Sequence, residues 1–293
     1  MSRLLIIDGH AYAYRAFHAI RELRSPDGQP TNAVYGFLKM LEKMQLTVKP
    51  THLMVVWDGG LSVERMTALP EYKAQRAPMP DDLRPQFDEI GKYLAAAGVS
   101  AYCGEGVEAD DYIATLARRA EAAGWNVVVA SPDKDFMQLV SVRVGLLNPN
   151  DKTGTIWGRE QVFAKSGVEP GQVADWLALM GDAVDNIPGV PGVGLKTAAS
   201  LLQEFGSVGK IFSHLDAVKS EKLRAALAAS AAAVRRNQEL VRLHDVPCHW
   251  EPESLQIRLA DAEKLRGLFQ RWGFRGMLAE LEAQSAVQQT ELI

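Results

Sequence analysis

Three short apolar segments that each lead into aspartate constrain the fold of this chain most. The segments span residues 4–7, 53–57 and 127–130, and the aspartates that follow them are Asp8, Asp58, Asp133 and Asp135. Nearly continuous apolar runs of this length are typical of strands buried on both faces, as in a parallel sheet covered by helices. Helical patterns separate the segments, at residues 32–46, 81–97 and 110–123. Strands that alternate with helices predict an α/β domain with a mostly parallel sheet flanked by helices over about residues 1–170.

The acidic residues gather where a parallel α/β sheet binds its ligands, at the carboxyl ends of the strands. Five more acids join them: Glu108, Asp110, Asp111, Asp182 and Asp185. Each acid alone has an ordinary explanation as a helix cap, a turn residue or a charge at a helix N-terminus. Asp182 and Asp185 share one face if their segment is helical. The repetition of aspartate after three successive strands favours a common site.

A pocket lined by this many ionised carboxylates is unfavourable unless cations lie among them. Two unit charges 4 Å apart interact by about 4 kcal/mol at an effective dielectric near 20, so the carboxylates would repel one another or stay protonated. Oxygen ligands without histidine or cysteine favour Mg²⁺ or Mn²⁺ over Zn²⁺. Two such ions about 3.5–4 Å apart are the usual apparatus for phosphodiester cleavage. The acids therefore predict a two-metal centre for hydrolysis.

The charge balance agrees with a nucleic-acid partner only when these nine acids are set aside. The 293 residues are 47% hydrophobic and 23% charged, with a net charge of −4, whereas DNA-binding proteins usually carry a basic surface. Without the nine acids, 27 acidic residues face 32 basic ones. No apolar run approaches the roughly 20 residues that span a bilayer, and no secretory signal is recognised. Two cysteines far apart in the sequence indicate neither a disulfide nor a zinc site and predict a reducing cytosol.

Residues 59–85 lose any helical or strand period and contain four prolines among several basic residues. A segment this long without a regular element is usually a functional loop or a lid. Within it, Tyr72, Lys73 and Arg76 combine an aromatic ring with two cations, which suits single-stranded nucleic acid. A solvated basic loop is at least as compatible with these three residues alone.

A glycine-rich segment at residues 187–198 lies in a region where helices replace strands, after about residue 171. It is not a phosphate loop of the P-loop type, because Leu195 separates Gly194 from Lys196. The pattern predicts a tight turn between two helices, the second at residues 195–205. The N-terminus of that helix, with Lys196 beside it, is suited to bind a phosphate without reading base sequence. A plain helix–turn–helix corner is the alternative.

These motifs together resemble the bacterial and phage 5′-nucleases of the flap endonuclease superfamily, over nearly the whole chain. The resemblance is greatest to the 5′→3′ exonuclease domain at the N-terminus of bacterial DNA polymerase I. The shared motifs are Ile7-Asp8-Gly9, Val56-Trp57-Asp58, Glu108-Ala109-Asp110-Asp111, Ser131-Pro132-Asp133-Lys134-Asp135, and Gly181-Asp182 with Asp185-Asn186-Ile187-Pro188-Gly189. The resemblance implies a PIN-like α/β nuclease core over residues 1–170, with a helical arch inserted at about 59–90. A helical DNA-binding region would occupy residues 171–293, with a helix–three-turn–helix motif at about 175–205.

The resemblance also implies roles for the acids. The first metal ion would be held mainly by Asp8, Asp58, Glu108 and Asp110. The second would be held by Asp110, Asp133, Asp135 and Asp182, with Asp111 and Asp185 contributing directly or through water. The chain keeps the second-metal aspartates that some relatives lose, which favours catalysis over binding alone.

Other residues would contact DNA or a monovalent cation, by the same resemblance. Lys73 and Arg76 would approach the scissile phosphate, and Tyr72 would stack on a base near it. Further DNA contacts would come from Arg84, Gly189, Gly192, Gly194, Lys196 and Thr197. The glycine turn would bind K⁺ through the main-chain carbonyls of Leu179, Met180, Pro188, Val190 and Val193.

The predicted function is a structure-specific 5′→3′ exonuclease and 5′-flap endonuclease in replication (removing primers or flaps) and repair. Its cofactors would be two Mg²⁺ or Mn²⁺ ions and K⁺, and its substrate DNA with a 5′ single-stranded flap or a 5′ end next to duplex. A DNA polymerase is a compatible partner, and we expect a monomer in the bacterial cytosol or nucleoid, away from membranes. No polymerase domain follows, so the chain is expected to be either a free-standing nuclease or an excised fragment. Two alternatives stay open: a ribonuclease on the same fold, and a non-catalytic protein that binds DNA junctions.

Overall fold

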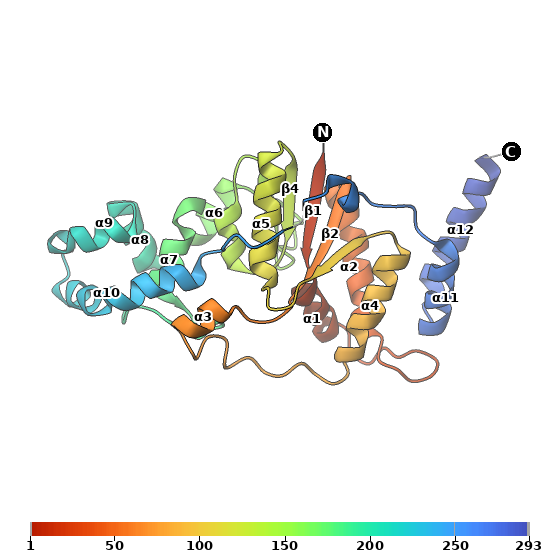
Figure 1. Ribbon diagram of the computed structural model, residues 1–293, viewed down its shortest axis with the longest axis horizontal. Coiled ribbons are helices and arrows are strands. Elements are labelled where there is room, and N and C mark those ends of the chain that lie inside the picture. Colours follow the sequence, from red (N-terminus) through yellow and green to blue (C-terminus); the bar gives the residue numbers. More distant parts are fainter. Residues whose placement is uncertain (1, 249, 292–293) are drawn as a thin grey trace. The chain divides into compact units, whose positions relative to one another are not determined.

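The computed structural model describes residues 2–248 and 250–291 (Figure 1). The chain divides into two compact units. The first comprises Met1–Trp57, Pro78–Cys103 and His249–Ile293, and the second comprises Asp58–Ala77 and Gly104–Cys248. In the described residues, no helix is long and apolar enough to cross a membrane. The predicted domain boundary near residue 170 stays a prediction.

The first unit contains three parallel strands in the order β3-β2-β1. They are β1 (Arg3–Asp8), β2 (His52–Trp57) and β3 (Ser100–Cys103). The apolar side chains of residues 4–7 have 0% exposure, which confirms a strand buried on both faces. Asp8 pairs with Val56 and so ends β1 at its carboxyl edge. The helices of this unit are α1 (Gly9–Ala19), α2 (Asn32–Val48), α4 (Arg84–Ala96), α11 (Ala262–Trp272) and α12 (Arg275–Glu291), with a 3-10 helix, η4 (Pro252–Leu255).

The glycine after Asp8 is required by close packing between the start of α1 and the end of β2. A Cβ atom at Gly9 would lie 2.6 Å from the ring of Trp57, nearer than real Cβ contacts allow. The Trp57 ring in turn stacks on Phe37, with ring centroids 5.8 Å apart, and meets Phe87 edge-on at 5.2 Å. The Ile-Asp-Gly motif therefore places Asp8 directly beside an aromatic cluster of the core.

The second unit begins with α3 (Val63–Ala68) and α5 (Ala109–Ala122), followed by parallel strands β4 (Asn126–Ala130) and β5 (Val144–Leu147). Strand β6 (Ile156–Trp157) pairs antiparallel with β5, and the two-residue strands β7 (Gly181–Asp182) and β8 (Ile187–Pro188) form an antiparallel pair. The remaining helices are α6 (Arg159–Ser166), α7 (Val173–Met180), α8 (Leu195–Phe205), α9 (Val208–Ser213) and α10 (Glu221–Val241). Three 3-10 helices complete it: η1 (Lys134–Leu139), η2 (Pro170–Gln172) and η3 (Leu215–Ala217).

Several elements differ from the prediction. Strands do not cease after residue 171, because β7 and β8 pair within the helical region. The helix predicted at residues 81–97 begins at Arg84, since Pro85 is favoured in a first turn and a tight turn precedes it. Before α4, the segment predicted as a helical arch contains one helix, the six-residue α3, among turns and loop. The helix predicted at residues 195–205 is confirmed as α8.

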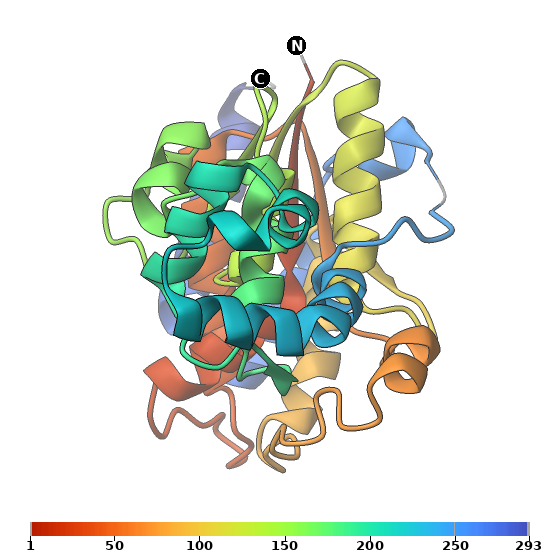
Figure 2. The same ribbon diagram turned by 90° about the vertical axis from the view of Figure 1, so that its left-hand side faces the viewer.

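Helix α10 is the longest element of the second unit and organises it. It packs along α7 and also contacts α3, β8 and α9 (Figures 1 and 2). Leu227, Val234 and Leu240 form its buried face, at 3% exposure or less. One helix therefore contacts both the β7–β8 pair and the first helix after Asp58.

Candidate metal centre

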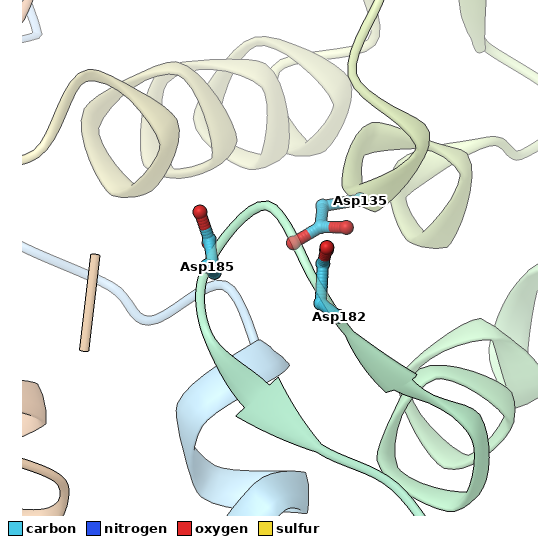
Figure 3. A group of neighbouring side chains, drawn as sticks. All are labelled: Asp135, Asp182 and Asp185. Atoms are coloured by element: carbon cyan, nitrogen blue, oxygen red, sulfur yellow. The ribbon is translucent and has the colours of Figure 1, made fainter. Parts of the chain in front are cut away.

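Three of the predicted acids converge in the second unit. Asp135 lies in the first turn of η1, Asp182 in β7, and Asp185 in the loop between β7 and β8 (Figure 3). Each offers a carboxylate oxygen, and these oxygens all lie within 4.8 Å of one another. A cluster that donates only carboxylate oxygens suits a hard divalent cation such as Mg²⁺ or Mn²⁺.

The β7–β8 pair that carries Asp182 and Asp185 depends on two glycines. A Cβ atom at Gly181 would lie 2.3 Å from the nitrogen of Gly189, and one at Gly189 would lie 2.1 Å from the carbonyl oxygen of Met180. Gly181 also has φ of +76°, in the region that favours glycine. The segment of Asp182 and Asp185 is not helical, so the condition for a shared helix face is not met, and the two residues belong to a hairpin instead.

Asn237, which belongs to helix α10 and not to the hairpin, binds the backbone of α7 and β8. Its side-chain amide is fully buried and donates to the carbonyl oxygens of Ala178, at 3.2 Å, and Pro188, at 2.7 Å. Sequence analysis did not single out Asn237, because its partners lie 59 and 49 positions away.

One oxygen of the cluster, Asp135 Oδ1, is buried without a hydrogen-bond donor among the described residues. Burial, and then the neighbouring charge of Asp133, raise the pKa of Asp135 well above its usual value. Buried polar atoms are normally satisfied, so an acceptor without a donor, among other acids, fits a metal ligand. The donor set and this atom together agree with a divalent cation here.

Glu108 stands at the centre of a second group and is almost completely buried, at 2% exposure. It accepts hydrogen bonds from Lys73 Nζ at 2.6 Å, from the Tyr72 hydroxyl at 3.1 Å and from the Ser62 backbone nitrogen at 2.9 Å. Arg65 Nη1 lies 3.3 Å from the same carboxylate. Burial alone would raise the pKa of Glu108, but Lys73 and Arg65 outweigh it and lower the pKa. Glu108 is therefore ionised and firmly held.

Lys73 and Arg76 both lie beside the acids, and their predicted approach to a scissile phosphate stays a prediction. The Lys73 ammonium lies 3.9 Å from Asp110 Oδ2 and 3.9 Å from Asp185 Oδ2. Its burial opposes the charged form, yet Asp110 and Glu108 raise the pKa of Lys73 above its usual value. Arg76 Nη2 donates to Asp185 Oδ1 at 2.9 Å, and its side chain is 43% exposed. Lys73 has φ of +55°, uncommon for a residue with a side chain, which is typical of functional sites.

Tyr72 does not form the exposed stacking surface that the sequence predicts. Its residue exposure is 4%, and the ammonium of Lys73 lies 4.9 Å from its ring centroid. The hydroxyl donates to Glu108, so the tyrosine braces the acids in this structure instead of facing solvent. Burial raises the pKa of Tyr72, which keeps the hydroxyl protonated as a donor.

The other predicted acids take distinct positions. Asp58 accepts from the Ala109 nitrogen at 3.0 Å, at the start of α5, and Asp133 accepts from the Asp135 nitrogen at 2.9 Å. Asp111 is bound on both oxygens by Arg65, at 2.7 and 2.8 Å, so the structure does not bring it to the acid cluster of Figure 3.

Two predicted residues belong to the first unit. Asp8 ends β1 and caps α1, where its Oδ1 accepts from the Ala11 nitrogen at 3.0 Å. Arg84 is exposed and begins α4.

Lys134 is a site residue that the sequence analysis did not single out. Its ammonium lies 2.6 Å from Asp182 Oδ2. Burial disfavours the charged form, but Asp182, Asp135 and Asp133 raise the pKa of Lys134. The signal that could have identified it is a cation placed between Asp133 and Asp135 in one motif.

The glycine turn leads into α8, whose N-terminus faces solvent. Gly192, Gly194 and Lys196 are exposed, and Gly192 has φ of +80°. Thr197 is half-buried behind them. Backbone nitrogens at such a terminus can bind phosphate.

The carbonyl groups predicted to bind K⁺ are partly engaged in hydrogen bonds. Leu179 accepts from the Val190 nitrogen at 2.8 Å, and Val190 accepts from the Val193 nitrogen at 3.0 Å. Pro188 accepts from Asn237, and Met180 lies against Gly189. A carbonyl oxygen has two lone pairs, so one bond does not prevent it from binding a cation. The K⁺ site stays a prediction.

Comparisons with known protein families cover most of the chain. Residues 3–167 match the family described as 5′-3′ exonuclease, N-terminal resolvase-like domain. Residues 168–263 match 5′-3′ exonuclease, C-terminal SAM fold. A 5′-3′ exonuclease of Aquifex aeolicus is 39% identical over 284 residues, which are 96% of each chain. DNA polymerase I of Bacillus caldotenax is 39% identical over 293 residues, 99% of this chain and 33% of the polymerase, so the chain spans about a third of that relative.

Solved structures of similar fold agree with these matches. T5 5′-exonuclease with divalent zinc ions bound has a TM-score of 0.69 and 28% identity, covering 82% of this chain and 89% of its own. The catalytic core of Rad2, with a TM-score of 0.64 and 14% identity, covers 92% of this chain and 87% of its own, and shows the fold alone.

These matches confirm the predicted fold class, an α/β core with a mostly parallel sheet and a helical C-terminal region. They also confirm the prediction of a 5′-nuclease and offer no support for the two alternatives. The acid cluster and the metal-bound relative support a divalent-metal cofactor. From residue 3 to residue 263, then, the chain belongs to the 5′-3′ exonuclease family.

Proposed function

We propose that this chain hydrolyses DNA phosphodiester bonds at a 5′ single-stranded flap, or at a 5′ end next to duplex. The observation that carries the proposal is the position of Asp185. It belongs to the three-carboxylate cluster of Figure 3, and it also accepts a hydrogen bond from Arg76 and lies 3.9 Å from Lys73. One site thus combines oxygen ligands for cations with positively charged side chains for a phosphate.

Two divalent cations, when bound, would activate water and stabilise the charge on the attacking and leaving oxygens. We propose Asp135, Asp182 and Asp133 as ligands of one cation, with Asp185 in direct or water-mediated contact. Asp8, Asp58 and Glu108 would hold the other, and Asp110 would contribute to both sets of ligands. Mg²⁺ or Mn²⁺ fits this all-oxygen donor set better than the zinc bound in the T5 relative.

Lys73 and Arg76 supply the positive charge of the chain itself. Their neighbours keep both side chains protonated, since Asp110 and Glu108 raise the pKa of Lys73, and Asp185 raises that of Arg76. A scissile phosphate that enters the site would compete with these carboxylates for the side chains of Lys73 and Arg76. The groups would then stabilise the negative charge that develops on the phosphate in the transition state. Tyr72 would turn from Glu108 to the neighbouring base only if the loop moves.

The exposed N-terminus of α8 is the proposed duplex contact. Gly192, Gly194 and Lys196 present backbone nitrogens and a cation that suit a phosphate backbone. Gly189, Thr197 and Arg84 would add contacts, and the carbonyls of the glycine turn would hold K⁺. Relatives of this fold have been solved with DNA: the T5 D15 flap endonuclease in a pseudo-enzyme-product complex and the Rad2 core with DNA substrate.

The biological setting follows the relatives. Because DNA polymerase I carries a matching segment, we propose a role beside a DNA polymerase in replication and repair. We propose that it removes primers or flaps ahead of the polymerase, as a monomer in the bacterial cytosol or nucleoid.

The test separates cleavage from binding. We expect Asp133→Asn to abolish cleavage of a flap substrate and to leave flap binding largely intact, because the variant removes a metal ligand and no DNA contact. The matched control is Asp245→Asn, since Asp245 is exposed and pairs only on the surface, with Arg118 at 2.7 Å. Cleavage by Asp133→Asn at the rate of the control would overturn the metal assignment.

A further inference from the structure

We propose that Arg65 and Asp111 form a positioning pair that fixes Glu108 and the start of α5 beside the metal centre, and that Asp111 is not a metal ligand. This inference rests on the proposed function, because it concerns the same site. The two residues are 46 positions apart, in α3 and α5, and both lie in the second unit. Both are buried, Arg65 at 5% and Asp111 at 4% exposure.

The pair has the strongest geometry available to an arginine and a carboxylate. Arg65 Nη1 donates to Asp111 Oδ2 at 2.7 Å, and Nη2 donates to Oδ1 at 2.8 Å. The planar fork of arginine matches a carboxylate with two parallel bonds, which a lysine cannot do. Asp111 Oδ1 also accepts from the His244 backbone nitrogen at 2.8 Å. Both oxygens of Asp111 are therefore engaged by donors within this junction, and Asp111 is not among the carboxylates that cluster within 4.8 Å of one another.

The remaining donors of Arg65 bind the end of α10. Nε donates to the carbonyl oxygen of Leu240 at 3.0 Å, and Nη2 donates to that of Arg242 at 2.9 Å. Helix α10 ends at Val241, and the last carbonyls of a helix have no partner within it. Arg65 supplies that partner, so the pair joins α3, α5 and the end of α10.

Glu108 is the acid that this junction positions. Arg65 Nη1 lies 3.3 Å from Glu108 Oε2, the oxygen that also accepts from Lys73. Lys73 is proposed to leave for the phosphate, whereas Arg65 is fixed by Asp111 and two carbonyls. Arg65 is thus the cation that holds Glu108 throughout, and Asp111 anchors the first turn of α5, in which Asp110 lies.

The junction also relates the two groups of acids. Asn237 lies one turn before the end of α10 and holds the carbonyls of Ala178 and Pro188. The same helix therefore holds the hairpin of Asp182 and Asp185 through Asn237, and the junction at Glu108 through Arg65. A shift of α10 would change the spacing of the acids, and with it the affinity for cations.

The test measures metal binding and stability in parallel. Mn²⁺ binding to the metal-free full chain is counted by electron paramagnetic resonance, for Arg65→Lys, Asp111→Asn and the apolar double variant Arg65→Met/Asp111→Leu. We expect the number of bound ions to stay that of the wild type and the affinity to fall about tenfold, as is typical when a residue behind a ligand is changed. At saturating Mg²⁺, kcat on a flap substrate should fall about 10–100-fold, with KM changed far less.

The double variant distinguishes positioning from stability. Removing one partner leaves a buried charge and lowers the melting temperature, whereas replacing both with apolar residues restores it. We expect the double variant to regain stability but not Mn²⁺ affinity, because the fixed cation beside Glu108 is then lost and Lys73, Tyr72 and the Ser62 backbone alone hold it. Arg118→Lys is the matched control: Arg118 also joins α5 to the segment after α10, through Asp245 and the Leu243 carbonyl, but lies on the surface.

Three results would overturn the inference. Loss of one bound Mn²⁺ in Asp111→Asn would make Asp111 a ligand. Wild-type Mn²⁺ affinity in Arg65→Lys, or recovery of affinity together with stability in the double variant, would reduce the pair to a structural role. Mn²⁺ binding needs no substrate, so these outcomes can be measured even if the wild type cleaves no DNA. Absence of cleavage by the wild type would instead contradict the proposed function.

Discussion

At the scale of single residues, the burial of Asp135 beside another acid makes the stability of the fold depend on pH. In the unfolded chain its carboxyl ionises near the usual pKa of 3.8, whereas burial and Asp133 raise the pKa in the folded chain. Between pH 3.8 and the raised pKa, the folded state therefore binds more protons than the unfolded state. The free energy of unfolding of the metal-free protein falls as pH rises through this interval, and a divalent cation bound to the folded state restores stability.

The first prediction follows from this linkage. Asp135→Asn removes the buried charge, so in EDTA at pH 7 we expect it to raise the melting temperature above that of the wild type. Mg²⁺ should raise the melting temperature of the wild type and raise that of the variant much less. The measurement is thermal unfolding followed by circular dichroism, with and without Mg²⁺. A variant that melts below the wild type in EDTA would contradict the claim that the buried charge of Asp135 destabilises the metal-free protein.

Site residues could be predicted where local sequence features mark them, and not where a distant partner determines their role. The acids are recognisable because several follow strand ends or sit in short motifs, and these are local features. Which of Asp110 and Asp111 binds Arg65 is not a local feature, since both lie in the first turn of α5 and Arg65 is 46 positions from Asp111. Tyr72 was predicted as an exposed ring for a similar reason, because nothing in its neighbourhood in sequence shows that Glu108 binds its hydroxyl.

At the scale of elements, the β7–β8 hairpin determines the spacing of Asp182 and Asp185. We expect Gly189→Ala to lower the melting temperature and to weaken Mn²⁺ binding, because the new Cβ would lie 2.1 Å from the Met180 carbonyl oxygen and force the crossing apart. Gly171→Ala is the matched control in the same unit, where a Cβ meets nothing within 4 Å. The measurement is Mn²⁺ titration with parallel thermal unfolding.

Equal Mn²⁺ affinity in Gly189→Ala and Gly171→Ala would show that the backbone crossing at Gly181 and Gly189 does not determine the spacing of Asp182 and Asp185. Such a result would leave Asn237 as the remaining support of the hairpin, through its bond to Pro188.

The elements that were predicted and those that were missed differ in how they are stabilised. Strands β1, β2 and β4 and helix α8 have continuous apolar runs or a helical period, which are visible within a short window. Strand β3 alternates between exposed and half-buried residues over four positions, and β7 and β8 have two residues each. The last two strands exist because Gly181 and Gly189 allow two backbones to cross, which no periodicity reveals.

At the scale of the whole molecule, family membership followed from motifs spread over the chain, because each motif places its acids by local geometry. The partners that hold those acids could not be predicted. Arg65 and Asp111 are 46 positions apart, and Asn237 and Pro188 are 49 apart. Such contacts depend on how α10 packs, and a single sequence contains no signal for that packing.

The central claim is cleavage of flapped DNA by a divalent-metal centre. The most direct measurement uses the wild type and a 5′-labelled flap substrate with Mg²⁺, with Ca²⁺ and with EDTA, read as the length of the labelled product, with a matched RNA flap beside it. We predict a short product that ends near the junction, with DNA and Mg²⁺ and not with Ca²⁺ or EDTA. Tight binding without product under every condition would contradict the account.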